Sequence, residues 1–137
     1  MDYDMVIRNG TVVTASDSSR CDIGVKNGRI TTLADHLPPA PQDIDASDKL
    51  VLPGGIDSHC HIEQKSSAGI MCADDFYSGS VSAAFGGTTT IIPFAAQHRG
   101  DSLRDVVHDY HMCAEPKAVI DYAFHLIITD PTESILN

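Results

Sequence analysis

Basic residues and long apolar runs are scarce in this sequence. Nine lysines and arginines stand against 19 aspartates and glutamates, so the formal charge is −10. A chain without a basic patch has little with which to displace counterions from phosphates, and this excludes a nucleic-acid partner. No apolar run approaches the roughly 20 residues of a membrane-spanning helix. The acidic start at Met1–Asp4 lacks the basic-then-apolar order of a signal peptide, so we expect no membrane partner.

Paired cysteines are also missing. The sequence has four cysteines, all far apart and without a Cys-x-x-Cys step, which excludes a disulfide framework and a zinc ribbon. A reducing, cytoplasmic location is the expectation. With 42% hydrophobic residues in 137, the chain is long enough to form an ordinary globular core.

Residues 1–53 predict a small antiparallel β unit. Two pairs of apolar runs are each divided by an Asn-Gly step, at Asn9–Gly10 and at Asn27–Gly28. This step is a strong signal for a type I′ hairpin, because both turn residues must adopt positive φ. Arg8 and Lys26 precede the two turns, and we expect both side chains to be solvated. The unit contains no residues that suggest chemistry.

Residues 54–137 have the pattern of strand–helix units. The pattern predicts strands at 55–61, 88–94 and 117–127, and helices at 76–85, from Asp101 or Ser102 to about 114, and from about 131. Units that repeat at roughly 30 residues indicate a parallel sheet with crossover helices. Three units cannot close a (β/α)₈ barrel, which needs roughly 250 residues. We therefore expect this sequence to be the front part of a longer protein.

Two histidines in the run Pro53–His61 are the main chemical signal. On a strand, His59 and His61 point to the same side with Cα atoms roughly 6.5–7 Å apart, close enough to converge on one metal ion. Two imidazoles are too few for a structural zinc site, so they suggest an open, reactive centre. A buried hydrogen-bonded pair or a surface coincidence is the alternative. Asp57 shares their side and either orients a ligand or caps the backbone.

Four segments together resemble dihydropyrimidinases and bacterial hydantoinases of the amidohydrolase superfamily. They are Pro53–His61, Ala73–Gly79, Ala83–Ile92 and Lys117–His125. The resemblance covers essentially the whole chain. It implies an α/β protein in which 1–53 are the N-terminal part of a small β-sandwich-like domain. Residues 54–137 would then be the first, incomplete part of a metal-dependent (β/α)₈ TIM barrel.

The resemblance also implies a mechanism. His59 and His61 would bind one of two Zn²⁺ ions, and a metal-bridging hydroxide would attack the ring amide carbonyl of a dihydropyrimidine, hydantoin or related imide. The family's other ligands, a carboxylated lysine, two histidines and an aspartate, would lie beyond Asn137. No catalytic or substrate-binding residue is assigned within this chain, so it should be inactive alone. The full-length protein is expected to be a homotetramer.

Residues after His61 narrow the substrate class. Related dihydroorotases have an arginine there that binds a carboxylate, whereas this chain has Ile62–Gln64, which favours an uncharged cyclic ureide or imide. The loop at 63–71 is more polar than the apolar loop usual in hydantoinases. Either it offers less apolar contact to bulky ring substituents, or it is a solvated loop without contact to substrate.

Alternatives remain within the same superfamily. One is an allantoinase-like or other cyclic-ureide or imide amidohydrolase, and another is a non-catalytic, dihydropyrimidinase-related scaffold protein. Scaffold relatives have lost the metal-binding histidines, and this chain keeps both. The remaining histidines suggest less. We expect His108 and His111 to be exposed on a helix, His98 to lie in a loop and His125 to fit a strand core.

Overall fold

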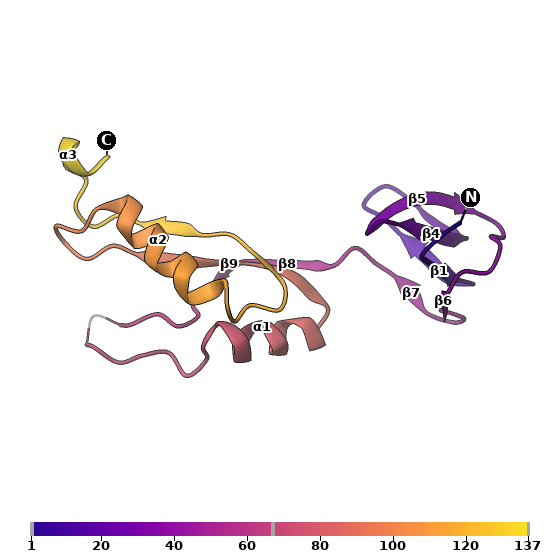
Figure 1. The fold of residues 1–137 in the computed structure, drawn as a ribbon, viewed down its shortest axis with the longest axis horizontal. Coiled ribbons are helices and arrows are strands. Elements are labelled where there is room, and N and C mark those ends of the chain that lie inside the picture. The colour runs from indigo at the N-terminus through magenta and orange to yellow at the C-terminus, as the bar shows by residue number, and fades with distance from the viewer. Residues whose placement is uncertain (1, 67, 137) are drawn as a thin grey trace. The chain divides into compact units, whose positions relative to one another are not determined.

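The computed structural model describes residues 2–66 and 68–136. The chain divides into two compact units, Met1–Pro53 and Gly54–Asn137 (Figure 1). The first unit contains only strands among its described residues, and the second is mixed α/β. None of the helices in the described part of the chain is long and apolar enough to cross a membrane.

Two small sheets make up the first unit. One has the strand order β5-β4-β1-β6 and the other β3-β2-β7. Their strands are β1 (Met5–Arg8), β2 (Thr11–Val13), β3 (Ser18–Arg20), β4 (Asp22–Lys26), β5 (Arg29–Ala34), β6 (Gln42–Asp45) and β7 (Leu50–Val51). The prediction of a wholly antiparallel unit is wrong, because β1 pairs parallel with β6 and β2 pairs parallel with β7.

Only one of the two predicted hairpins forms. β4 and β5 pair antiparallel across Asn27 and Gly28, whose φ angles of 51° and 70° fit the predicted type I′ turn. The first hairpin is wrong, since β1 and β2 belong to different sheets. Asn9 has a φ of 61°, but Gly10 serves close packing instead: a Cβ there would lie 2.6 Å from Val51 Cγ2.

The solvation predicted for Arg8 is wrong, whereas the Lys26 side chain is exposed as predicted and forms a surface ion pair. The Arg8 guanidinium donates from Nε to Asp43 Oδ1 at 2.6 Å and from Nη1 to Asp22 Oδ2 at 3.1 Å. Lys26 Nζ lies 2.9 Å from Asp4 Oδ1. For Arg8 the cause is strand order, because β1 lies between β4 and β6 and each neighbour brings an aspartate beside it. The sequence pattern alone did not give that order.

A parallel sheet forms the centre of the second unit. β9 pairs with β8 along one edge and with β10 and β11 along the other. The elements are β8 (Gly55–Cys60), α1 (Phe76–Phe85), β9 (Thr88–Ala96), α2 (Leu103–Ala114), β10 (Asp121–Tyr122), β11 (His125–Ile127) and α3 (Glu133–Leu136). The predicted third strand is broken into β10 and β11, and its first residues instead continue the turn after α2, where the Ala118 amide donates to Ala114.

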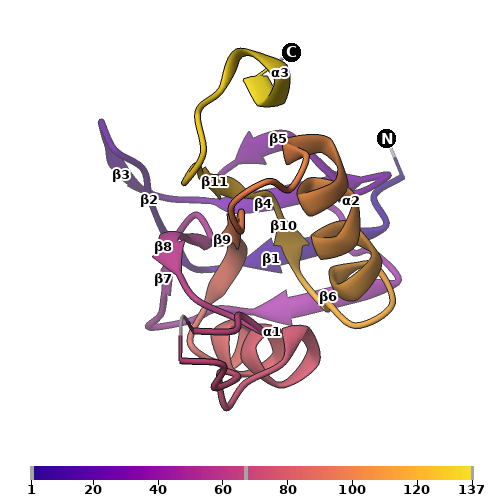
Figure 2. The same ribbon diagram turned by 90° about the vertical axis from the view of Figure 1, so that its left-hand side faces the viewer.

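Helix boundaries follow the predicted caps. Asp75 caps α1 by accepting from the Ser78 amide, and the Ser78 hydroxyl accepts from the Asp75 amide in return. Ser102 caps α2. Figure 2 shows α2 alongside β10, where His111 packs against Tyr122 at a ring-centroid distance of 5.7 Å.

One face of β9 packs into the core of this unit. Ile91 joins Ile62, Phe76 and Ala114 in a buried apolar cluster. The side chains that alternate with Ile91, including Phe94, are only half-buried. An apolar, β-branched run such as Thr88–Phe94 is typical of a strand buried on both faces, but in the described chain only one face of β9 is buried. The half-buried side is the one that faces the histidines.

Candidate metal centre

The pair His59 and His61 lies at the carboxyl end of β8. His59 is within the strand and His61 directly follows it. Parallel strands end at a common edge, which is where α/β proteins usually place ligands. The neighbouring strand β9 contributes Phe94 to the same place.

Both imidazoles lie on the same side of the sheet. Their ring centroids are 5.7 Å apart, and each packs on the Phe94 ring, His59 edge-on at 4.7 Å and His61 stacked at 5.2 Å. Both residues are exposed. The predicted alternation is thus confirmed, and the rings are neither turned apart nor buried. That they bind metal stays a prediction.

Hydrogen bonding leaves His61 with a suitable ligand atom. Its Nδ1 contacts the Gln64 side-chain oxygen. An amide oxygen can only accept, so Nδ1 must bear the hydrogen, and the lone pair of the neutral ring is then on Nε2. Metal-binding histidines commonly have their second nitrogen fixed in this way. Gln64 is therefore part of the site, although sequence reasoning treated it only as part of a polar loop.

Asp57 caps the backbone beside the pair. Its Oδ1 accepts from the His59 amide at 3.1 Å. Of the two roles that the sequence left open, the described contacts support the cap. The same carboxylate has a small electrostatic effect on Cys60, whose thiol pKa is raised chiefly by burial and secondarily by Asp57.

Glu63 anchors the loop that follows the histidines. Its Oε1 lies 2.5 Å from Lys117 Nζ, and its Oε2 accepts from the Phe76 amide at the start of α1, at 3.1 Å. The hydrogen bond from Glu63 raises the pKa of Lys117. Glu63 also has a φ of 49°. Both carboxylate oxygens of this loop residue are therefore bonded, whereas the contact of the loop with a substrate stays a prediction.

A cavity of about 520 Å³ opens next to His61. Its lining combines polar and apolar side chains: His61, Gln64, Ser66, Ile70, Met71 and Cys72. Ile70 and Met71 are 70% and 54% exposed. Two apolar side chains of the otherwise polar loop at 63–71 therefore face this space.

The other histidines form no ligand set. Within the described ranges, no group of three or more histidine, cysteine or acidic side chains is placed to bind a metal ion. His98, His108 and His111 are exposed, and His111 also packs on Phe124 at 4.9 Å. His125 is exposed rather than in the core, and its Nε2 lies 3.0 Å from the Ser58 carbonyl oxygen.

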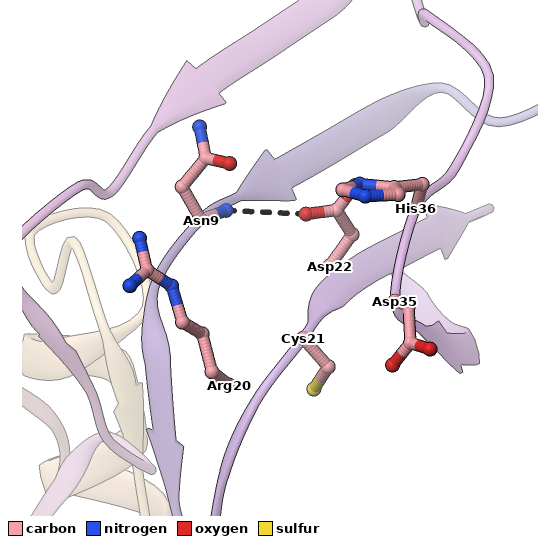
Figure 3. Close-up of a pocket in the computed structure, with 6 residues that line it drawn as sticks. All are labelled: Asn9, Arg20, Cys21, Asp22, Asp35 and His36. Carbon is pink, nitrogen blue, oxygen red and sulfur yellow. Dashed lines mark hydrogen bonds between the residues drawn. The ribbon is translucent and has the colours of Figure 1, made fainter.

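The first unit contains a second cavity, of about 340 Å³ (Figure 3). It is lined by Asn9, Arg20, Cys21, Asp22, Asp35 and His36. The Asp22 carboxylate accepts from the Asn9 amide, drawn as a dashed line, and also from Arg8 and the Leu37 amide. Because these bonds occupy Asp22, the cavity resembles a structural crevice rather than a ligand site.

Several known proteins are similar to this chain in sequence. No family model matches. The D-hydantoinase of Ralstonia pickettii is 47% identical over 133 residues, covering 97% of this chain and 29% of the relative. The dihydropyrimidinase of Rattus norvegicus is 40% identical over 131 residues, covering 91% of this chain and 25% of the relative.

Solved structures give the same result. A D-hydantoinase structure superposes with a TM-score of 0.92 at 46% identity, covering 99% of this chain and 29% of that one. The D-hydantoinase of a Thermus species gives 0.87 at 34% identity, covering 96% and 30%. An N-acyl-D-glutamate deacylase from Bordetella bronchiseptica, at 0.65 and 23% identity, covers 98% and 34% and is similar in fold alone.

Fold and similarity together define the class as metal-dependent amidohydrolases. Within it, the chain belongs to the hydantoinase and dihydropyrimidinase family, as its sequence predicts. It corresponds to an N-terminal portion, spanning 24–29% of the length of the curated relatives that it matches.

Proposed function

We propose that this chain is the N-terminal part of a metal-dependent cyclic amidohydrolase. The enzyme would hydrolyse the ring amide C–N bond of dihydropyrimidines, hydantoins or related imides. The single observation that supports this most is the pair of exposed imidazoles at the carboxyl end of β8, 5.7 Å apart. Similarity of 40–47% to a dihydropyrimidinase and to D-hydantoinases supports the same activity.

Zinc is the metal that these residues would hold. Both rings are exposed on one side, and the Gln64 contact leaves His61 Nε2 as a neutral nitrogen donor, which zinc accepts readily. The histidines would supply two ligands of one ion, and the others would come from outside this chain. Bound zinc would polarise the ring carbonyl and lower the pKa of the attacking water.

The second unit would form the first part of a TIM barrel. Its parallel order, with β8, β9 and then β10 and β11, supports this. The first unit would be the N-terminal part of a β-sandwich-like domain, which its two sheets support. The homotetramer and the cytoplasmic location stay predictions.

An uncharged ring is the preferred substrate class. Residues 62–64 contain no arginine, which is what related dihydroorotases use to bind a substrate carboxylate, and the nearby Lys117 is paired with Glu63. The cavity beside His61 offers Ile70 and Met71 to the ring substituent. These contacts favour hydantoins with apolar substituents over very polar rings.

The test uses the protein made from the complete reading frame around these residues. We expect bound zinc by metal analysis and hydrolysis of dihydrouracil, hydantoin or succinimide. His59→Ala and His61→Ala should each lower hydrolysis by at least about 100-fold, because loss of mere outer-shell partners already costs 10–100-fold. His108→Ala, an exposed helix residue, is the matched control.

The 137-residue chain by itself should retain little or no zinc after dialysis. Two equivalents bound to the chain alone would contradict the assignment of the remaining ligands elsewhere. Hydrolysis by the His59→Ala variant at the rate of the wild type would contradict the proposed function.

A further inference from the structure

The peptide group between Ser58 and His59 is held at both ends by side chains. Its carbonyl oxygen, on Ser58, lies 3.0 Å from His125 Nε2. Its N–H, on His59, donates to Asp57 Oδ1 at 3.1 Å. This is the peptide that immediately precedes the Cα atom of His59. Its orientation therefore directs where the imidazole points.

The sheet is irregular at this point, which explains why side chains are needed. The register between β8 and β9 shifts between Asp57 and Cys60, so one residue of β8 has no counterpart. Cys60 pairs with Pro93, which has no N–H to donate. The regular hydrogen-bond pattern between β8 and β9 therefore cannot continue between Asp57 and Cys60. The polar backbone atoms of this stretch need other hydrogen-bond partners.

His125 supplies one of those partners from 67 residues away. It is the first residue of β11, in register with Phe94 of β9. A carbonyl oxygen only accepts, so the contact requires the hydrogen on Nε2 of His125. The same imidazole lies 5.1 Å from the Phe94 ring, on which His59 and His61 both pack. His125 thus touches both supports of the histidine pair, the peptide and the aromatic ring.

We infer that His125 is a positioning residue for metal binding by His59 and His61. It fixes the Ser58–His59 peptide by donating a hydrogen bond across β9, and it backs the ring on which both ligands rest. The inference rests on the proposed function for its metal. Its structural part, the orientation of His59, stands independently of that function.

The experiment compares His125→Leu, His125→Gln and the control His108→Leu in the protein made from the complete reading frame. The first readout is the dissociation constant for Zn²⁺, measured by competition with a chromophoric chelator. His125→Leu should weaken binding about tenfold, the lower end for supporting partners of metal ligands. His125→Gln keeps an N–H donor near the position of Nε2 and should recover most of the affinity. Equal affinity in the wild type and His125→Leu would overturn the inference.

The second readout is the crystal structure of each metal-free protein. In His125→Leu, the His59 ring should leave its edge-on contact with Phe94, whereas in His125→Gln it should stay. If the wild type binds no zinc, the proposed function fails, and the ring position alone decides this inference. An unmoved His59 ring overturns it.

A folding failure of His125→Leu does not leave the question open. His125→Asn has the same amide as His125→Gln on a shorter side chain that cannot reach the Ser58 carbonyl. A tenfold difference in zinc affinity, or a displaced His59 ring, between these two variants supports the positioning role. Identical behaviour of the two overturns it.

Discussion

At the residue scale, Asp22 shows how the first unit manages a buried charge. It is 2% exposed, yet its carboxylate accepts from Arg8 Nη1 at 3.1 Å, from the Asn9 amide at 3.1 Å and from the Leu37 amide at 3.0 Å. A buried carboxylate is tolerated only when it is paired and hydrogen-bonded in this way. Asp22 thereby joins the start of β4 to the end of β1 and to the loop after β5.

Asp22→Ala should lower the free energy of unfolding by about 3 kcal/mol, because two partly buried amides lose their acceptor and the Arg8 guanidinium loses one of its two carboxylate partners. Urea unfolding followed by circular dichroism measures the change. Asp43→Ala removes the exposed partner of the same arginine and is the matched control, with a smaller loss expected. An Asp22→Ala protein as stable as the control would show that Asp22 is not a structural hub.

The sequence predicted the common orientation of His59 and His61 but not the residues that support them. The spacing of His59 and His61 is local, and alternation along one strand places both rings. The contacts of Gln64, Glu63 and His125 depend on a left-handed residue in a loop or on a partner more than 50 positions away. Such contacts follow from tertiary packing, which a local pattern does not encode.

At the scale of elements, β8 and β9 meet closely at Gly54. A Cβ on Gly54 would lie 2.1 Å from Thr89 Oγ1 and 2.3 Å from its Cγ2. Contacts this short do not occur between real side chains, so the two segments come together only because residue 54 is glycine. The neighbouring Gly55 is less crowded, with its nearest contacts at 3.4 Å.

Gly54→Ala should therefore destabilise the second unit by about 1–3 kcal/mol through overpacking, measured by thermal unfolding. Gly55→Ala, one residue away, should have a smaller effect and controls for the loss of glycine itself. The double variant Gly54→Ala/Thr89→Ala should regain part of the stability, because it removes Thr89 Oγ1 and Cγ2 and leaves only its Cβ, at 2.7 Å, in close contact. If the double variant is no more stable than Gly54→Ala, the steric explanation is incorrect.

The boundaries of the helices α1 and α2 were predicted best, because residues at the helix ends define them. Asp75 and Ser102 begin α1 and α2, and glycines after Phe85 end α1, as local capping chemistry requires. The two Asn-Gly steps differ in outcome because strand pairing is not local: the partner of β1 is β4, on the far side of β2 and β3 in the sequence. The parallel pairs β1–β6 and β2–β7 were not predicted, again because their partners are distant in the sequence.

For the molecule as a whole, the net charge is −10, and several of the carboxylates that contribute to it accept hydrogen bonds. The pKa of Asp45 is lowered to about 2, chiefly by the Ser47 hydroxyl and then by Asn9. Hydrogen bonds also lower the pKa of three other aspartates. The main donor is the Asn27 amide for Asp4, the Arg8 side chain for Asp43 and the Ser78 amide for Asp75. The folded protein therefore binds these protons less readily than the unfolded chain.

Acid should destabilise the protein over a defined window. Because the folded pKa values lie below the unfolded value of 3.8, the stabilisation is complete above that pH and is lost as the pH falls from 3.8 towards about 2. A circular-dichroism titration between about pH 6 and about pH 2 checks this. Asp45→Asn should flatten the dependence within the window, whereas Asp2→Asn, an exposed residue, should not.

An unchanged pH dependence in Asp45→Asn would contradict this prediction.

The fold class and the family were predictable at this scale, since a repeated strand–helix pattern and four spaced segments extend over most of the chain. The pairing of sheets in the first unit was not.

The contact between His125 and Ser58 has a consequence for exchanging parts between homologous proteins. The two residues are 67 positions apart, yet together they hold one peptide of β8. A chimera whose crossover falls between His61 and His125 would take His59 and His61 from one parent and His125, which supports them, from the other. An exchanged segment that includes all of residues 57–125 would keep the histidine pair and His125 from the same parent.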